Sequence, residues 1–237
     1  MMKRKGLFIT GTDTGIGKTI VTGGLARLLR RQGITPGVMK PVETGCLAAK
    51  GGPIARDGRF LKFMAGAEEP LEQIVPYRLL APLAPYAAAA KENVRIQPAK
   101  IKRHYKQISG HHPFTLVEGA GGLLVPITRK YFMADLIQTL NLPVLLVCRL
   151  GLGTLNHSLL SLDYLKKHHI PVAGIVLNNA ENHRGPANAS NPEILKELGS
   201  VPVLGTIPYQ PDIRPIRSQC RRISDTIARH IDFKKIL

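Results

Sequence analysis

The residues best suited to chemistry lie near the start of the chain, in the stretch GTDTGIGKT at residues 11–19. Small residues let the backbone fold tightly around a phosphate group, so that successive N–H groups point at it. Lys18 adds a mobile cation for the β- and γ-phosphates of a nucleotide, and the Thr19 hydroxyl is a ligand that Mg²⁺ accepts. The stretch therefore predicts a site for a nucleoside triphosphate and its metal.

The flanking residues place this stretch between a strand and a helix. The apolar run GLFIT at 6–10 predicts a short buried strand, and apolar residues recur at helical spacing within 20–31. Strand, Gly-rich loop, Lys-Thr and helix form a P-loop. Gly11 stands one place earlier than the strict pattern requires, and Thr12 occupies the strict position. A Gly-rich turn without a ligand is the alternative, which the strand–loop–helix context disfavours.

The rest of the chain alternates between predicted strands and helices. We predict strands at 34–42, 114–118, 142–150, 172–177 and 203–207, and helices at 57–66, 98–109, 154–169, 192–198 and 218–230. Residues 70–93 read as a loop with a helical piece, and the polar stretch 182–192 as a surface loop. The alternation predicts an α/β fold, with a single P-loop NTPase-like domain over 1–237 and a mostly parallel sheet with helices on both faces.

Ligands in such sheets bind beyond the carboxyl ends of the strands, and this rule selects further residues. Lys40 lies in the second predicted strand near its end, with Glu43 and Thr44 just past it. Glu118 ends the third predicted strand, and Asn178 follows a later one. Taken singly, each residue has an alternative interpretation: Lys40 could be a solvated residue at a strand end, and Glu118 could cap a helix. Their common placement at one sheet edge favours a shared site.

Composition limits the kind of protein this chain can be and where in the cell it works. Hydrophobic residues make up 44% of the chain, enough for a sizeable core, and no window is long and apolar enough to span a membrane. The basic start at 1–5 precedes an apolar run too short for a signal peptide, so we expect a cytoplasmic protein. The three cysteines lie far apart and predict neither a disulfide framework nor a zinc site.

The formal net charge of +17 indicates either an anionic partner or simply a solvated basic surface. Basic residues gather at 91–112 and 214–235, which contain only one aromatic residue each, Tyr105 and Phe233, and only 5% of the chain is aromatic. Nucleic-acid sites on single strands usually combine the two residue types. We therefore favour the solvated surface over nucleic-acid binding.

Several segments together resemble the dethiobiotin synthetase family, ATP-dependent carboxylases that close the ureido ring in biotin synthesis. Besides the P-loop, whose displaced first glycine is the family's form, the resemblance rests on KPV at 40–42, VEGAGG at 117–122, the Gly and LNH of 151–157, GIVLN at 174–178 and GTIP at 205–208. It covers nearly the whole chain. It implies Mg²⁺- and ATP-dependent carboxylation of 7,8-diaminononanoate by CO2, through a carbamate and a carbamic–phosphoric anhydride, to give dethiobiotin, ADP and phosphate. It also implies a homodimer with the site at the interface, and neither a nucleic-acid nor a membrane partner.

The resemblance assigns roles to individual residues. The implied catalytic residues are Lys18, Lys40 and Thr14. Nucleotide contacts are implied for Thr12, Asp13, Thr14, Gly15, Ile16, Gly17, Lys18 and Thr19, and for Glu118, Asn178 and Pro208. Metal ligands are implied at Thr19, Asp57 and Glu118. Substrate contacts are implied for Thr44, Gly121 and Gly122, and, across the dimer interface, for Gly153, Thr154 and Asn156 at a helix start that we expect Thr154 to cap.

The preferred nucleotide stays open at this point, and two alternative families have to be weighed. Some family members carry an acidic residue near the base, where this chain has Arg214-Pro215, so the preferred nucleotide is undecided. A ParA/MinD-like ATPase switch that binds DNA or membrane shares the fold and suits the charge. Such proteins carry a second Lys early in the P-loop, which residues 12–14 lack. A cobyrinate-type amidoligase would need an added glutaminase domain, for which this length leaves no room.

Overall fold

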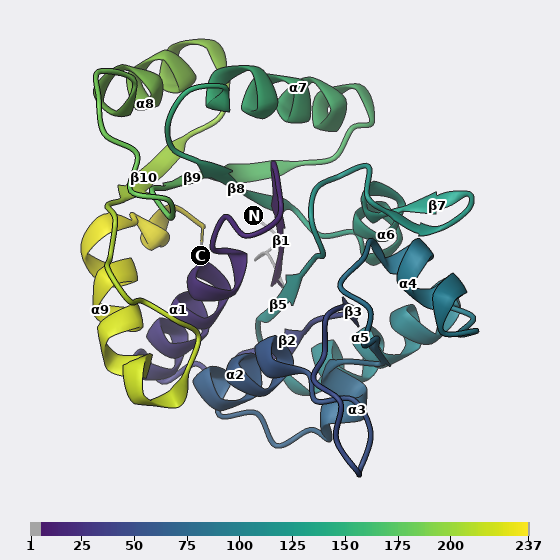
Figure 1. Cartoon of the computed structure of the whole chain (residues 1–237). Helices are drawn as coiled ribbons and strands as arrows, with labels where there is room; N and C mark the ends of the chain where they lie inside the picture. The colour runs from purple at the N-terminus through teal and green to yellow at the C-terminus, as the bar shows by residue number, and fades with distance from the viewer. Residues whose placement is uncertain (1–5, 237) are drawn as a thin grey trace.

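The computed structural model of the chain describes residues 6–236. Six parallel strands form the central sheet in the order β10-β9-β8-β1-β5-β2, with helices on both faces (Figure 1). These strands are β1 (Gly6–Gly11), β2 (Gly37–Met39), β5 (Thr115–Glu118), β8 (Val144–Arg149), β9 (Val172–Asn178) and β10 (Val203–Ile207). The fold class predicted from the sequence is therefore confirmed. The basic segment 1–5, which we predicted not to form part of a signal peptide, lies outside the described residues.

Two small strand pairs and the helices complete the description. β3 (Val42–Glu43) pairs with β4 (Tyr77–Arg78), and β6 (Pro126–Thr128) pairs with β7 (Tyr131–Phe132). The helices are α1 (Lys18–Arg31), α2 (Arg56–Ala65), α3 (Leu71–Ile74), α4 (Pro85–Lys91), α5 (Pro98–His111), α6 (Met133–Leu140), α7 (Thr154–Lys167), α8 (Ala187–Leu198) and α9 (Cys220–His230), with 3-10 turns η1 (Arg217–Gln219) and η2 (Phe233–Ile236). Among the described residues, no helix has the length and apolarity to cross a bilayer.

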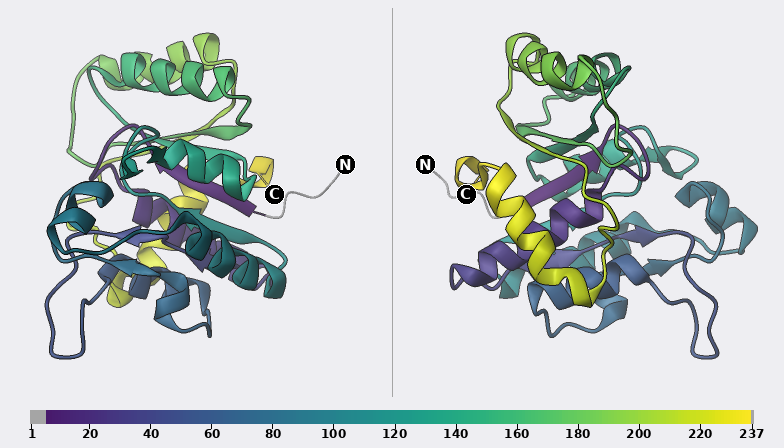
Figure 2. Two further views of the ribbon diagram at one scale, coloured as in Figure 1. Left: turned by 90° about the vertical axis from the view of Figure 1, so that its right-hand side faces the viewer. Right: turned by 60° about the vertical axis from the view of Figure 1, so that its left-hand side comes forward.

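The central strands supply both hydrophobic cores because successive side chains of a strand point to opposite faces. Leu7 and Ile9 of β1 join the core on the face covered by α1, α2 and α9, whereas Phe8 joins the core covered by α5, α6 and α7. The two further views in Figure 2 show helices on either side of the sheet. Covered on both faces, β8 reads as an almost uninterrupted apolar run, as a central parallel strand should.

The structure corrects several predicted elements. The strand predicted at 34–42 is only β2, because the chain leaves the sheet at Lys40 and then forms β3, which pairs with β4 outside the central sheet. The surface loop predicted at 182–192 ends early, since α8 begins at Ala187 and contains Pro192. That helix therefore starts before the predicted 192–198. Helix α6 was not predicted from the sequence, although its buried residues are all apolar.

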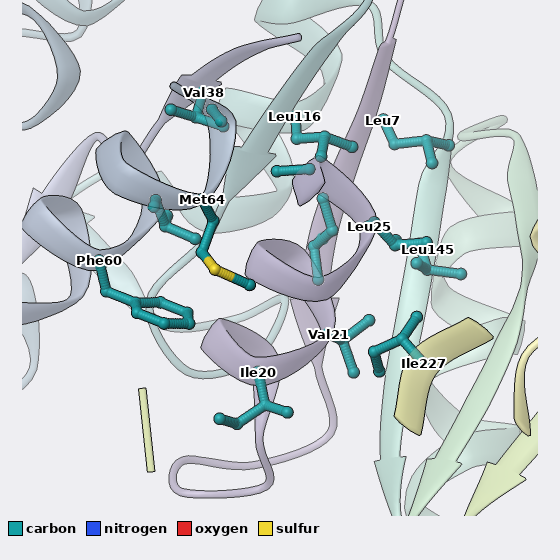
Figure 3. Packing of buried hydrophobic residues seen from close by; sticks show 14 of the residues in the cluster. Leu7, Ile20, Val21, Leu25, Val38, Phe60, Met64, Leu116, Leu145 and Ile227 are labelled. Carbon is teal, nitrogen blue, oxygen red and sulfur yellow. The ribbon is translucent and has the colours of Figure 1, made fainter. Parts of the chain in front are cut away.

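The packing of α1 generates a stability prediction. Leu25 is 3% exposed and lies among the side chains of the sheet, α2 and α9 (Figure 3). Leu25→Ala removes buried methyl groups and leaves a cavity, so it should lower the free energy of unfolding by roughly 2–5 kcal/mol in urea titrations. Leu160→Ala, at a side chain 61% exposed on α7, is the control and should change it by less than about 0.5 kcal/mol. Equal losses in both variants would contradict this view of the core.

Candidate active site

The loop between β1 and α1 has the backbone shape of a phosphate cradle. Gly15 and Gly17 adopt φ angles of 76° and 91°, a left-handed conformation that strongly favours glycine. A Cβ on Gly17 would also collide with the side-chain amide of Asn178. That amide donates to the Ile16 carbonyl at 2.8 Å, so the end of β9 holds the loop in place. The local sequence and a distant strand together fix the cradle.

Lys18 begins α1 and turns back over this loop. Its Nζ donates to the Asp13 carbonyl at 2.6 Å, and the side chain is buried. Burial lowers the pKa of Lys18 to about 8, because desolvation of the ammonium outweighs the attraction of Glu118, and the nearby charge of Lys40 lowers it further. The pKa of Lys18 therefore lies far below that of an exposed lysine while its ammonium faces the site.

Lys40 holds the centre of a buried cluster of charges. Its Nζ lies 2.6 Å from Oδ2 of Asp57 and 2.7 Å from Oε1 of Glu118. Burial by itself would lower the pKa of Lys40, but the carboxylates of Glu118, Asp57 and Glu43 outweigh it and raise this pKa. Burial likewise opposes ionisation of Asp57, yet the Lys40 ammonium holds the pKa of Asp57 below its usual range. Both members of this pair are thus charged at neutral pH.

Glu43 is a residue of the site for which the sequence analysis proposed no role. Its two carboxylate oxygens accept hydrogen bonds from the backbone N–H groups of Asp57 and Gly58, at 3.0 and 2.9 Å. These N–H groups belong to the first turn of α2, where backbone donors otherwise lack partners, and a negative charge there is favoured by the helix dipole. Burial raises the pKa of Glu43 against the effect of Lys40. Glu43 thereby fixes the start of α2 and, with it, Asp57.

The predicted metal ligands do come together. The Thr19 hydroxyl donates to Oε1 of Glu118 at 2.8 Å, and both residues lie with Asp57 around Lys40. The other oxygen of Glu118, Oε2, is buried without a hydrogen-bond partner among the described residues. An orphaned carboxylate oxygen beside a hydroxyl and a second carboxylate is the hard donor set that Mg²⁺ prefers. Within residues 6–236, no three His, Cys, Asp or Glu side chains form a metal site by themselves. The residues present therefore fit an ion that takes its remaining ligands from phosphate and water.

One cavity of about 890 Å³ joins these groups. Its walls include most of the predicted site residues, namely Thr14, Gly15, Gly17, Lys18, Thr19, Lys40, Thr44, Asp57, Glu118, Gly121, Asn178 and Pro208. Thr12, Asp13 and Ile16 belong to the P-loop without lining the cavity, and Gly122 packs against the Gly11 carbonyl. The wall also contains Arg214 and Pro215, which the sequence placed near the nucleotide base, and residues that the sequence did not suggest, among them Pro82–Pro85, Tyr209, Gln210, Asp212 and Ile213. Residues 82–84 form a loop that follows no strand of the central sheet, whereas residues 209–215 lie just beyond the carboxyl end of β10.

The start of α7 stands apart from this cavity. Gly153, Thr154 and Asn156 are not among the residues that line it. The prediction that Thr154 caps α7 is wrong: Gly153 occupies the cap position with φ 85°, and the Thr154 hydroxyl donates instead to the Arg149 carbonyl at 2.6 Å. No side chain caps this helix start. Next to it, Leu152 is 88% exposed. An uncapped helix start beside an exposed leucine is suited to contact with another molecule.

The sheet order, the glycine-rich loop after the central strand β1 and the lysine at the start of α1 define a P-loop nucleotide-binding protein. A family model described as an AAA domain matches residues 5–217. The ATP-dependent dethiobiotin synthetase BioD of Thermodesulfovibrio yellowstonii is 38% identical, with 99% of each chain covered. The BioD of Anaeromyxobacter dehalogenans is 40% identical, over 97% of this chain and all of the relative. The chain therefore belongs to the dethiobiotin synthetase family, as its motifs indicated.

Comparison with solved structures supports the fold independently. The MinD cell division protein of Aquifex aeolicus superposes with a TM-score of 0.58 at 14% identity, over 95% of this chain and 96% of that one. At this level of identity, the likeness shows a shared P-loop fold and nothing about activity.

The lowered pKa of Lys18 predicts a pH dependence of nucleotide binding. Below about pH 8 the ammonium is charged and attracts phosphate, and above it the charge is lost. The affinity of the chain for ADP should therefore fall as the pH rises through 8, as titration calorimetry would measure. Lys18→Arg keeps its charge throughout this range and should bind with a flatter pH profile. An identical fall in both proteins would assign the titration to another group.

The two hydrogen bonds of Glu43 predict that it positions Asp57. Glu43→Gln removes the charge and leaves one acceptor oxygen, so it should raise the Mg²⁺ concentration needed for half-maximal binding of a fluorescent ATP analogue several-fold. The matched control is Asp135→Asn, because Oδ2 of Asp135 also accepts a backbone N–H at a helix start, from Phe132 at 2.7 Å, outside the cavity. Both variants should lose about 1 kcal/mol of stability. A shift of the Mg²⁺ requirement in both, or in neither, would contradict the positioning role.

Proposed function

We propose that the chain is a cytoplasmic ATP-dependent dethiobiotin synthetase, acting as one domain over 1–237 on 7,8-diaminononanoate and CO2. The observation that supports this most directly is the meeting of Lys40 with the P-loop residues Lys18 and Thr19 at the wall of one cavity. Relatives named for this activity match over almost the entire chain. Ligation of this kind requires a phosphate cradle and positive charge at the same place.

The proposed reaction proceeds in three steps. One amine of the substrate attacks CO2 and loses a proton, which gives a carbamate. A carbamate oxygen then attacks the γ-phosphorus of ATP, the bond to the bridging oxygen breaks, and ADP leaves. The second amine attacks the carbonyl carbon of the resulting carbamic–phosphoric anhydride, closes the ring and releases phosphate and a proton. The protein mainly has to align these groups and neutralise their charge.

The residues around the cavity suit this work. Lys18 would neutralise the β- and γ-phosphates, and Lys40 the carbamate and the phosphoryl group in transit. Thr14 and Thr44 would donate hydroxyl hydrogen bonds, and Asn178 and Pro208 would lie against the base. Bound Mg²⁺ would add positive charge at the phosphates, held by Thr19, Asp57 and Glu118. Because Lys40 is paired with both of these carboxylates in the structure, part of its charge becomes available to substrate only when those contacts loosen.

The proposed assembly is a homodimer in which the start of α7 faces the partner's cavity. The exposed side chain of Leu152 and the uncapped helix start support this arrangement. The backbone N–H groups near Gly153, Thr154 and Asn156 would hold the substrate carboxylate there. The ParA/MinD-like alternative rests on fold and net charge, and the P-loop lacks the second lysine it would need.

The direct test mixes the purified chain with ATP, Mg²⁺, bicarbonate and the diamine, and measures dethiobiotin by mass spectrometry and phosphate by a colorimetric assay. Equal amounts of the two products are expected. Hydrolysis of ATP without the diamine should be far slower. Hydrolysis that responds to DNA or to lipid vesicles, and not to the diamine, would overturn the proposal in favour of the ATPase switch.

Lys40 should be essential for turnover. Lys40→Ala should lower kcat by at least about 100-fold, because a preorganised positive charge at the reacting phosphoryl group is lost. The control is Lys50→Ala, at an exposed lysine outside the cavity, which should retain full activity. Circular dichroism would establish that both variants are folded. Turnover at the parent rate in folded Lys40→Ala would remove this residue from the mechanism.

Dimerisation and carboxylate binding should fail together. Leu152→Asp places a charge at the proposed interface, so sedimentation velocity should show monomers and the KM for the diamine should rise at least tenfold. Leu198→Asp is the control, because Leu198 is 56% exposed and precedes β10, whereas Leu152 follows the carboxyl end of β8. A diamine of the same length without the carboxylate should bind equally poorly to the Leu152→Asp and Leu198→Asp proteins. A fully active monomer would show that α7 does not contribute to a shared site.

A further inference from the structure

A second cavity, of about 610 Å³, lies on the face of the molecule covered by α1 and α2. It opens between the last turn of α1, the outer side of α2 and η1. Its walls contain four cationic side chains, those of Arg30, Arg59, Lys62 and Arg217, and no acidic one. None of these residues belongs to the cavity beside the P-loop. The proposed synthetase reaction gives them no role.

Three of the four cations contact uncharged groups. The Arg30 guanidinium packs so closely over Gly66 that a Cβ there would lie 2.5 Å from its Cζ. The Cζ of Arg217 stands 4.8 Å from the centroid of the Phe63 ring. Lys62 donates to the backbone carbonyls of Glu68 and Glu69, at 3.3 and 2.5 Å. Of the Glu69 carboxylate, Oε1 contacts His112, and Oε2 is buried without a hydrogen-bond partner among the described residues.

Arg30, Arg59 and Arg217 take part in no ion pair among the described residues. The next residue along α1 differs, since Arg31 lies 2.6 Å from Asp225 of α9. The cavity therefore holds no carboxylate to balance its four cations. Four like charges around one concave surface repel each other, and a bound anion relieves that repulsion. Guanidinium groups also match the oxygens of phosphate, to which each can donate two parallel hydrogen bonds.

We propose that this cavity binds an oligophosphate, a compact anion with two or more linked phosphate groups, supplied either as an inorganic chain or as the tail of a free nucleotide. Several phosphates are needed to meet cations contributed by α1, α2 and η1. The site is separate from the P-loop and does not depend on the proposed enzymatic function.

Calorimetric titration with sodium tripolyphosphate, in buffer without Mg²⁺, tests the proposal on the full chain. The parent protein should show two classes of site, one at the P-loop and one in this cavity. The double variant Arg59→Ala/Arg217→Ala should lose one class, with affinity there reduced at least tenfold, and keep the other. Lys18→Ala should show the converse and retain the cavity site. The matched control Arg103→Ala/Arg129→Ala removes the same charge from two exposed arginines outside the cavity and should keep both classes.

The source of the phosphate is distinguished in the Lys18→Ala protein by comparing ATP with tripolyphosphate. Tighter binding of ATP supports a nucleotide whose base contacts Phe63, and equal binding supports an inorganic chain. The proposal is overturned if the cavity double variant and the control weaken binding equally, since that would be an effect of net charge alone. It is also overturned if the folded Lys18→Ala protein binds no tripolyphosphate. Thermal unfolding curves would verify that all the variants are folded.

Discussion

The buried ion pair between Lys40 and Glu118 is the contact on which the rest of the site depends. Their side chains are 8% and 1% exposed, and they extend from the ends of two neighbouring strands, β2 and β5. A charge taken out of water in this way is tolerated only with a partner, and removal of one member of a buried pair typically costs about 3–5 kcal/mol. The pair therefore fixes how the two strand ends face the P-loop. Asp57 and Thr19 gather around it and complete the cluster.

The two lysines of the cavity show how position tunes the same side chain in opposite directions. Lys40 is surrounded by three carboxylates, which raise its pKa although it is buried. Lys18 has a backbone carbonyl as its hydrogen-bond partner and feels those carboxylates from farther away, so burial prevails and its pKa falls. One lysine is thus permanently charged and already paired, whereas the other is ready to gain a partner. Such a division suits a site that must hold substrate anions without losing its own structure.

Helix α2 connects this cluster to the rest of the molecule. Its first turn presents Asp57, held by the carboxylate of Glu43, and its apolar side packs against α1 in the core (Figure 3). Its outer side supplies Arg59 and Lys62 to the second cavity. Because α1 itself begins in the P-loop, the two helices share both the site and the core. The position of Asp57 is therefore set by packing as well as by charge.

Local patterns in the sequence determined much of this protein. The P-loop was readable because its glycines, Lys18 and Thr19 are consecutive, and the parallel sheet because β1, β8 and β9 are short apolar runs separated by helical periodicity. The strand-end rule then brought Lys40, Glu118 and Asn178 to one edge of the sheet. Only the tertiary structure decided the partners of these residues. Nothing near Glu43 in the sequence shows that it caps α2, since that helix begins 13 residues later at Arg56.

The same reason explains the predictions that were wrong. Threonine is a common residue type at helix caps, but the Thr154 hydroxyl donates to the Arg149 carbonyl, and Gly153 takes the cap position. The predicted strand at 34–42 ends early because β2 finds a partner only in β5, while Val42 pairs with Tyr77 in a separate sheet. The basic cavity unites α1, α2 and η1, elements far apart in the chain. Composition and spacing describe neighbours along the chain, whereas hydrogen bonds, ion pairs and cavities depend on neighbours in space, which the packing of the whole sheet determines.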